Sequence, residues 1–126
     1  MKLENLSETK FIEDANELKK CLAARTKHND NAFWLNNNAS TFPQLSILIK
    51  ENTATLQYLP KDGHPGFLSL GNLGQTDDVQ FRISESPADD LLIASKFLIT
   101  TTSAEIAAIE FFEGKSLPNS VEWMEL

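Results

Sequence analysis

The residues best suited to chemistry in this sequence are His64 and the side chains near it. His64 lies in the stretch 61–66, which is rich in turn residues and separates two predicted strands. Asp62, His64 and Ser69 have the residue types of a hydrolytic triad, but the Gly-x-Ser-x-Gly turn that exposes a serine nucleophile is missing. A loop histidine of this kind is more often structural than catalytic. We therefore predict no catalytic residue, with a small enzyme that uses His64 and Asp62 or Asp78 as an alternative.

The sequence offers little for metal or phosphate chemistry. One cysteine, Cys21, and two separated histidines do not supply the four ligands of a structural zinc site, and no His-Glu-x-x-His occurs. The acidic pairs 77–78 and 89–90 do not match the twelve-residue calcium loop. The stretch 71–74 lacks the Lys-Ser/Thr ending of a phosphate-binding loop. We predict no metal, no cofactor and no small-molecule substrate.

The charge of the chain is unevenly distributed. Residues 1–61 contain eight Lys/Arg and seven Asp/Glu, a net charge of +1, whereas residues 62–126 contain three Lys/Arg and eleven Asp/Glu, a net charge of −8. An acidic surface repels phosphate backbones and attracts basic proteins. We therefore predict a basic protein partner and no direct binding of nucleic acid. The alternative is that the acidity only maintains solubility.

The spacing of apolar residues predicts a helix near the N-terminus. Four apolar residues recur between Phe11 and Leu22 at intervals of four, three and four, which places them on one helical face. Ser7 or Thr9 is expected to cap the start of this helix. Acidic residues come early and basic residues late, an order that suits the helix dipole.

Alternating apolar and polar residues predict strands in the rest of the chain. The patterns indicate strands at 32–35, 67–70, 79–84 and 121–123, and a β-hairpin over 45–59 with a tight turn at Glu51-Asn52. The segment 91–100 is apolar without a clear period, and part of it is open to an extended conformation. Residues 102–105 have the form of a capping box and predict a second helix, which Gly114 is placed to end.

These elements predict an α+β fold in which an antiparallel meander of strands packs against two helices as one pair of layers. The length of 126 residues, without repeats or linkers, predicts a single domain, residues 1–126. We find neither an apolar signal segment at the N-terminus nor a run long enough to span a membrane. The single cysteine gives no sign of an oxidising compartment. We expect the protein to act in the cytoplasm and to have no membrane partner.

A specific combination of residues occupies the C-terminal third. The small-residue segment 102–111 ends in Glu-Phe and is followed by Gly114, Pro118 and the aliphatic-x-Trp stretch 121–123. In this order the residues resemble the tail of the immunity protein 1 family, whose members accompany bacterial polymorphic toxins. The glycine falls about one residue earlier than in the family. The stretch from Tyr58 to Asn72 is similar to the family's middle section, so the resemblance covers most of residues 45–126.

The resemblance implies a cytosolic antidote that binds a cognate toxin domain, often a nucleic-acid cytidine deaminase. Such toxins are expected to have basic clefts that accept nucleic acid around a zinc site, and an acidic inhibitor can fill such a cleft and exclude the substrate. The acidic half of the chain is also the half that resembles the family. The chain lacks the His-x-Glu and Pro-Cys-x-x-Cys elements of the deaminases themselves. A generic acidic adaptor is a further alternative.

We expect the partner to contact an apolar centre with an acidic rim. The candidate residues are Tyr58, Asp62, His64, Phe67, Asn72, Asp77, Asp78, Glu85, Asp89, Asp90, Glu122 and Trp123. Phe67 and Trp123 are of types that more often lie in a core, and the paired aspartates are more often solvated loop residues. The aspartates would support binding if they gathered on one face. Trp34 would be a further anchor if it were exposed.

Overall fold

The computed structural model describes residues 1–37, 40–74 and 77–126 and contains one large antiparallel sheet, a two-stranded ribbon and two α-helices. The large sheet has the order β10-β6-β5-β4-β3-β1-β2, and β9 pairs with β5. Its strands are β1 (Lys2–Asn5), β2 (Thr9–Phe11), β3 (Asp30–Asn37), β4 (Ser40–Lys50), β5 (Thr53–Leu59), β6 (Phe67–Leu70), β9 (Ile99–Thr100) and β10 (Glu122–Glu125). The ribbon consists of β7 (Val79–Phe81) and β8 (Leu91–Ile93).

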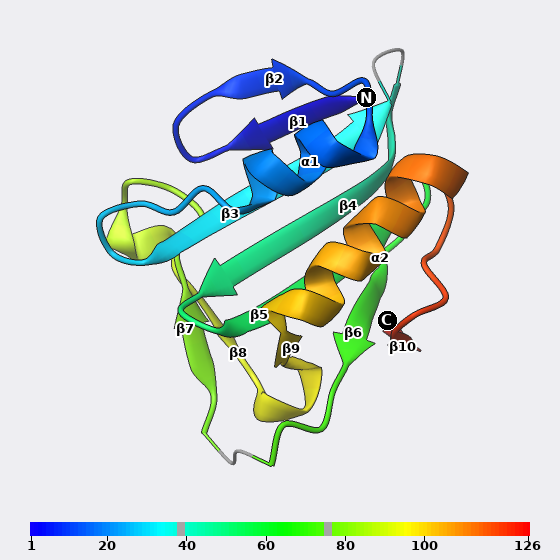
Figure 1. The fold of residues 1–126 in the computed structure, drawn as a ribbon. Coiled ribbons are helices and arrows are strands. Elements are labelled where there is room, and N and C mark those ends of the chain that lie inside the picture. Colours follow the sequence, from blue (N-terminus) through cyan, green and yellow to red (C-terminus); the bar gives the residue numbers. More distant parts are fainter. Residues whose placement is uncertain (38–39, 75–76) are drawn as a thin grey trace.

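Both helices lie on the same face of the large sheet (Figure 1). Helix α1 spans Ala15–Leu22 and α2 spans Thr101–Gly114, and short 3-10 turns occur at Pro87–Asp89 and Ser95–Phe97. Helix α1 buries Leu18 and Leu22. Helix α2 buries mainly small residues, which allow its backbone to approach the strands closely, together with Phe111. The predicted α+β class, with two helices on an antiparallel sheet, is confirmed.

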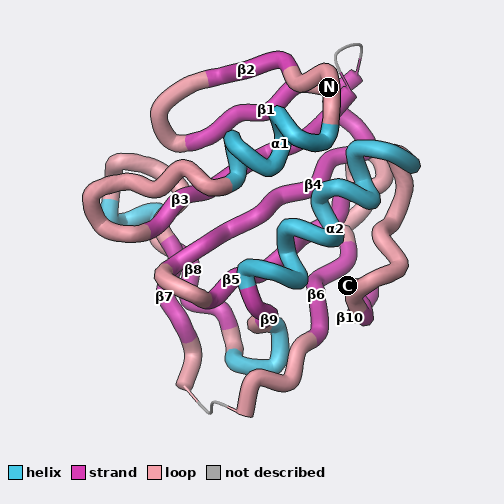
Figure 2. The backbone as a smooth tube through the Cα atoms, viewed as in Figure 1, coloured by secondary structure: helices cyan, strands magenta, loops and turns pink. Residues whose placement is uncertain are grey.

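The side chains of the central strands alternate between two apolar clusters. Phe33 on β3 and Ile47 on β4 belong to the main core beneath the helices. Their neighbours Ala32 and Leu48 form a second cluster with Phe81 of β7. Since successive residues of a strand point to opposite faces, the ribbon covers part of the face away from the helices. The tube in Figure 2 shows this ribbon beside the lower ends of β4 and β5.

The prediction for the N-terminus was wrong in its boundaries. Residues before Ala15 form the hairpin β1–β2, and β1 also pairs with β3. Phe11 lies in β2 and is 61% exposed, so it takes no part in the helical face. Asp14, not Ser7 or Thr9, caps α1 by accepting a hydrogen bond from the Glu17 backbone N–H at 2.8 Å.

Helix α2 begins earlier than its predicted capping box. The cap is Thr100, whose Oγ1 accepts a hydrogen bond from the Ser103 backbone N–H at 3.1 Å. Glu105 instead reaches across to Lys19 of α1, with Nζ and Oε1 4.0 Å apart. At the other end, Gly114 is the last helical residue, and Lys115 takes the left-handed conformation with φ 54°.

The middle of the chain follows the prediction closely. The hairpin of β4 and β5 turns at Glu51-Asn52, and Glu51 adopts φ 55°. The strand predicted at 79–84 ends at Phe81, because Arg82 leaves the ribbon ladder to bind Asp30 of β3. Within the described part of the chain, neither helix is long and apolar enough to cross a membrane.

Candidate partner-binding surfaces

Four of the candidate residues belong to an aromatic and histidine cluster at one edge of the large sheet. The ring of Tyr58 on β5 lies 6.0 Å from that of Phe67 on β6 and 6.4 Å from that of Trp123 on β10, between ring centroids. Burial raises the pKa of the Tyr58 hydroxyl. The Trp123 indole N–H donates to the Pro118 carbonyl at 2.8 Å. Tyr58, which is 7% exposed, is thus part of the main core, and Phe67 and Trp123 pack against it.

His64 completes this cluster. Its ring is stacked on Phe67, with centroids 5.4 Å apart and planes inclined by 10°. Nδ1 accepts a hydrogen bond from the Gly66 backbone N–H at 2.8 Å, so Nε2 carries the proton when the ring is neutral and faces Glu125 Oε2 at 3.2 Å. The histidine thus fixes the 60–66 loop against the end of β10, and its carboxylate partner is Glu125.

The triad drawn from Asp62, His64 and Ser69 does not form. Ser69 is 0% exposed, and its hydroxyl donates to the Phe97 carbonyl at 3.1 Å while it accepts from the Leu56 backbone N–H at 3.0 Å. A hydroxyl enclosed in this way cannot reach a substrate. Among the described residues, no group of three or more His, Cys, Asp or Glu side chains is placed to hold a metal ion.

The other acidic candidates lie on and around the ribbon. They are Asp77, Asp78, Glu85, Asp89 and Asp90, and all except the partly exposed Asp90 are exposed. Asp78 accepts a hydrogen bond from the Ser95 backbone N–H at 3.2 Å, and Asp89 accepts one from the Ser84 hydroxyl at 2.7 Å. Asp90 Oδ2 accepts from Gln80 at 3.4 Å, while its Oδ1 is buried without a hydrogen-bond partner in the part of the chain that the structure describes.

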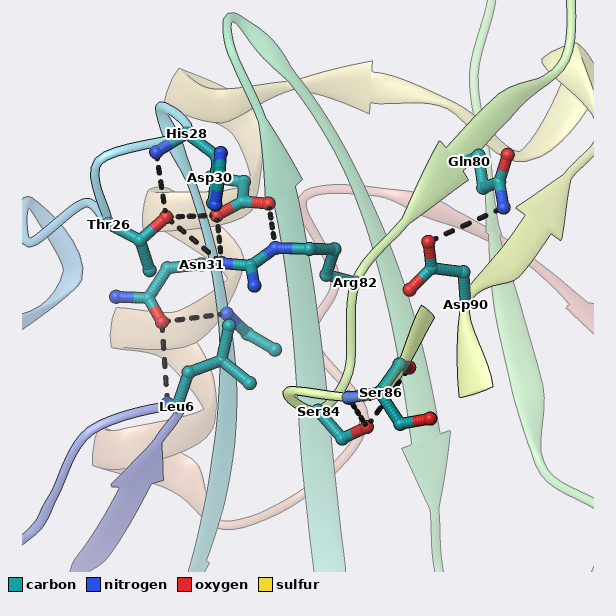
Figure 3. A network of polar contacts seen from close by, with 11 residues as sticks. Leu6, Thr26, His28, Asp30, Asn31, Gln80, Arg82, Ser84, Ser86 and Asp90 are labelled. Atoms are coloured by element: carbon teal, nitrogen blue, oxygen red, sulfur yellow. Dashed lines mark hydrogen bonds and ion pairs between the residues drawn. The ribbon is translucent and has the colours of Figure 1, made fainter. Parts of the chain in front are cut away.

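Arg82 ties the ribbon to the large sheet (Figure 3). Its Nε lies 2.7 Å from Asp30 Oδ2 and its Nη2 lies 2.9 Å from Asp30 Oδ1, a two-pronged ion pair, and Nη2 also donates to the Thr26 hydroxyl at 3.1 Å. Thr26 in turn donates to Asp30. The hydrogen bond from Arg82 holds the pKa of the Asp30 carboxyl below its usual value, and the same pairing raises the pKa of Arg82.

A hollow of about 220 Å³ lies between the ribbon and the outer face of the large sheet. We call it the ribbon groove. Its apolar lining comes from Trp34, Leu48, Leu56, Leu68, Ile83, Leu91 and Ile93, and Ser46, Thr55 and Gln57 are its polar members. Trp34 is partly exposed, as an anchor would need to be.

The two leucines of β8 were missed by the sequence reasoning. Leu91 is 42% and Leu92 is 67% exposed, although both are large apolar residues. They follow directly on Asp89 and Asp90, so an acidic pair next to an apolar pair was the available signal.

The structure therefore divides the twelve candidates between two surfaces. Tyr58, Asp62, His64, Phe67, Glu122 and Trp123 lie at the edge formed by β6 and β10, which we call the C-terminal edge, and the five ribbon carboxylates lie at the other surface. Asn72 is exposed in the loop after β6 and shares a shallow hollow with Glu122. The ribbon and β10 stand well apart in Figure 1.

Comparison with known proteins identifies a relative of this chain. No protein-family model matches the chain. The chain is, however, 30% identical over 116 residues to a protein of Burkholderia cenocepacia (strain H111) named "Double-stranded DNA deaminase immunity protein", and the aligned region covers 91% of each protein.

Proposed function

This chain belongs to the deaminase immunity protein family, whose members are inhibitors and not enzymes, and from that premise we propose that it binds and neutralises a cognate bacterial toxin domain that deaminates cytidine in nucleic acid. The observation that carries this proposal is the extent of the match, which spans 91% of the chain and so includes both the scaffold and the acidic half. We propose that residues 1–126 act as one binding domain, in the cytoplasm.

The proposed mechanism is stoichiometric occlusion of the toxin's basic substrate cleft. The net charge of −8 over residues 62–126 supports it, since a cleft that accepts DNA attracts an acidic protein and accelerates its encounter. The inhibitor needs no reactive group for this purpose. The fixed role of His64, between the Gly66 backbone and Glu125, agrees with a structural histidine and leaves the small-enzyme alternative without a site.

The direct test is a titration of a deaminase toxin domain, taken from the neighbouring reading frame, with this protein. Uracil formation in double-stranded DNA should fall in proportion to the added protein and vanish at about one equivalent, with a 1:1 complex on size-exclusion chromatography. His64→Ala should inhibit equally well in this assay. Full deaminase activity in the presence of a tenfold excess of folded protein would contradict the proposal.

The salt dependence of binding tests the electrostatic mechanism independently of the immunity role. If charge steers and holds the complex, the association rate and the affinity should both fall as the salt concentration rises from 50 to 500 mM, a range over which the Debye length shrinks to roughly a third. Inhibition with the same affinity throughout this range would leave the immunity role intact and exclude an electrostatic plug.

A further inference from the structure

We propose that the toxin domain docks on the ribbon groove, inserting an apolar side chain beside Leu91 and Trp34 while its surrounding cations contact Glu85, Asp89 and Asp90. This inference rests on the proposed function and names the surface and the chemistry through which it is carried out. It depends on three features of the ribbon, which are its exposed apolar residues, its net charge and its free strand edge.

The first feature is the unusual exposure of β8. Leu91 and Leu92 expose 42% and 67% of their surface, side by side in sequence, and Leu91 also lines the groove. Single exposed leucines are ordinary, but neighbouring ones beside an apolar hollow mark an interaction site. The volume of about 220 Å³ is below the range of roughly 300–1,000 Å³ typical of small-molecule pockets. The groove therefore suits one large side chain of a protein partner better than a metabolite.

The second feature is the charge around the groove. Residues 77–94 contain five carboxylates and one cation, Arg82, which sum to −4. The Arg82 guanidinium is paired with the Asp30 carboxylate through two contacts of 2.7 and 2.9 Å. The carboxylates consequently dominate the field at the rim. Glu85 follows the groove residue Ile83 by two positions, and Asp90 directly precedes Leu91, so carboxylates adjoin the apolar groove residues along the chain.

The third feature is the strand edge. In the described part of the chain the ribbon has the order β7-β8, and β8 pairs with β7 alone. An unpaired edge offers backbone N–H and C=O groups to a partner segment. A toxin loop that enters the groove would pass along this edge with Leu91 beneath it.

The C-terminal edge is the competing surface, and its geometry favours a structural role. Its aromatic side chains are committed to one another, with Tyr58 within 6.4 Å of both Phe67 and Trp123 by ring centroid. His64 is held by Gly66 and Glu125. Outside this cluster the edge exposes Met124 and separate carboxylates such as Asp62 and Glu122, and the hollow that Glu122 lines has a mixed polar and apolar lining, whereas most residues that line the ribbon groove are apolar.

The test compares matched variants at the two surfaces by measuring the Kd for the toxin domain at low salt. Glu85→Lys combined with Asp89→Lys changes the charge by +4 at the ribbon, and Asp62→Lys combined with Glu122→Lys makes the same change at the C-terminal edge. We expect the ribbon pair to weaken binding by about 100-fold, since like charges replace complementary ones, and the edge pair by less than about fivefold.

A second pair of variants tests the apolar contact without changing the charge of the protein. Leu91→Ser should weaken binding at least about tenfold, while Ile106→Ser, at a residue of α2 that is 49% exposed, should leave Kd unchanged. Urea midpoints for all variants confirm that each is folded. If wild-type protein inhibits the toxin and both ribbon variants bind normally, the docking surface is wrong although the proposed function stands. If wild-type protein neither binds nor inhibits, the proposed function itself fails.

Discussion

Replacing Arg82 by alanine removes the side chain that joins the ribbon to β3. Asp30, which is 5% exposed, would keep its charge and its contact with Thr26 but lose both prongs of the ion pair. Breaking a buried pair from one side typically costs about 3–5 kcal/mol, because the other charge stays buried without compensation. The side chain of Arg82 is 24% exposed, so solvent screens part of the interaction. We therefore expect a loss near the lower end, about 3 kcal/mol.

The assay is urea denaturation at pH 7, followed by the fluorescence of Trp34 and Trp123. With an m value of roughly 2 kcal/mol per molar urea, a loss of about 3 kcal/mol lowers the midpoint by about 1.5 M. The matched control is Lys2→Ala, which removes the pair of Lys2 and Glu4, 3.0 Å apart with side chains 37% and 43% exposed. An exposed pair of this kind contributes less than about 1 kcal/mol.

The pH dependence of the free energy of unfolding provides a second test of the Arg82–Asp30 ion pair. The Asp30 pKa in the folded protein lies below its usual value of 3.8, first because of the hydrogen bond from Arg82. Its contribution to stability is therefore complete at neutral pH and is lost as the pH falls from about 5 through the folded pKa. Without Arg82 the burial of Asp30 opposes ionisation, so the free energy of unfolding of Arg82→Ala should fall less steeply between pH 5 and pH 3 than that of wild type.

A double variant tests whether pairing or burial sets the cost. Arg82→Met with Asp30→Leu replaces both charges by apolar groups and should recover most of the stability lost in Arg82→Ala, because no buried charge is left unpaired. The reasoning is refuted if Arg82→Ala and Lys2→Ala have midpoints that differ by less than about 0.3 M at pH 7 and equal acid sensitivity.

Three further predictions concern the scaffold, each measured as a shift of the urea midpoint. Lys115→Gly should stabilise by roughly 0.5–1 kcal/mol, since Lys115 holds φ 54° at the end of α2, a conformation that glycine adopts without strain; a neutral or destabilising result would contradict this. Gly71→Ala should destabilise by at least about 2 kcal/mol, because the added Cβ would lie 1.7 Å from the Leu98 carbonyl oxygen; a midpoint like that of wild type would show that the backbone at Gly71 or Leu98 shifts without cost. Ser69→Ala should cost about 1–3 kcal/mol by leaving the buried Leu56 N–H without its side-chain acceptor, whereas Ser69→Thr should retain part of that bond.

The central hairpin was predictable from the sequence because its signal is local. In β4 and β5 the residues of the main core recur at every second position and the turn at Glu51-Asn52 lies between the strands, so the register and the face beneath the helices follow from a period of two. The second helix was predictable for the same reason, apart from its cap. Thr100 and Thr102 are equally good capping residues, and the choice depends on β9, which ends at Thr100 after pairing with β5.

The N-terminus was mispredicted because tertiary pairing outweighs a short helical pattern. Phe11 has the spacing of a helix face with Leu18 and Leu22, yet β1 can pair on both sides, with β2 and with β3. That pairing depends on β3, which starts about 25 residues later in the chain. A pattern within the first 22 residues contains no information about it.

The acidity of the candidate site was visible in the sequence, but its apolar centre was not. The segment 91–93 shows no period of two in the sequence because Leu92 is apolar although it is 67% exposed, whereas its neighbours Leu91 and Ile93 both line the groove. The groove itself also needs Trp34 from β3 and Leu68 from β6, which are brought together only by the sheet. Composition thus predicts the charge of the surface, and topology decides where on it a partner finds an apolar anchor.

The ion pair of Arg82 and Asp30 connects the stability of the fold with the character of this surface. Asp30 belongs to the nearly neutral half of the chain and Arg82 to the acidic half. The positive charge of the ribbon is therefore neutralised by a carboxylate of the large sheet. The ribbon is thereby attached by its own cation, and four of its five carboxylate residues, all except Asp90, are exposed. It follows that Arg82→Ala, where the protein stays folded, makes the ribbon no less acidic; any loss of toxin affinity in that variant would come from a displaced groove and not from a changed charge at the rim.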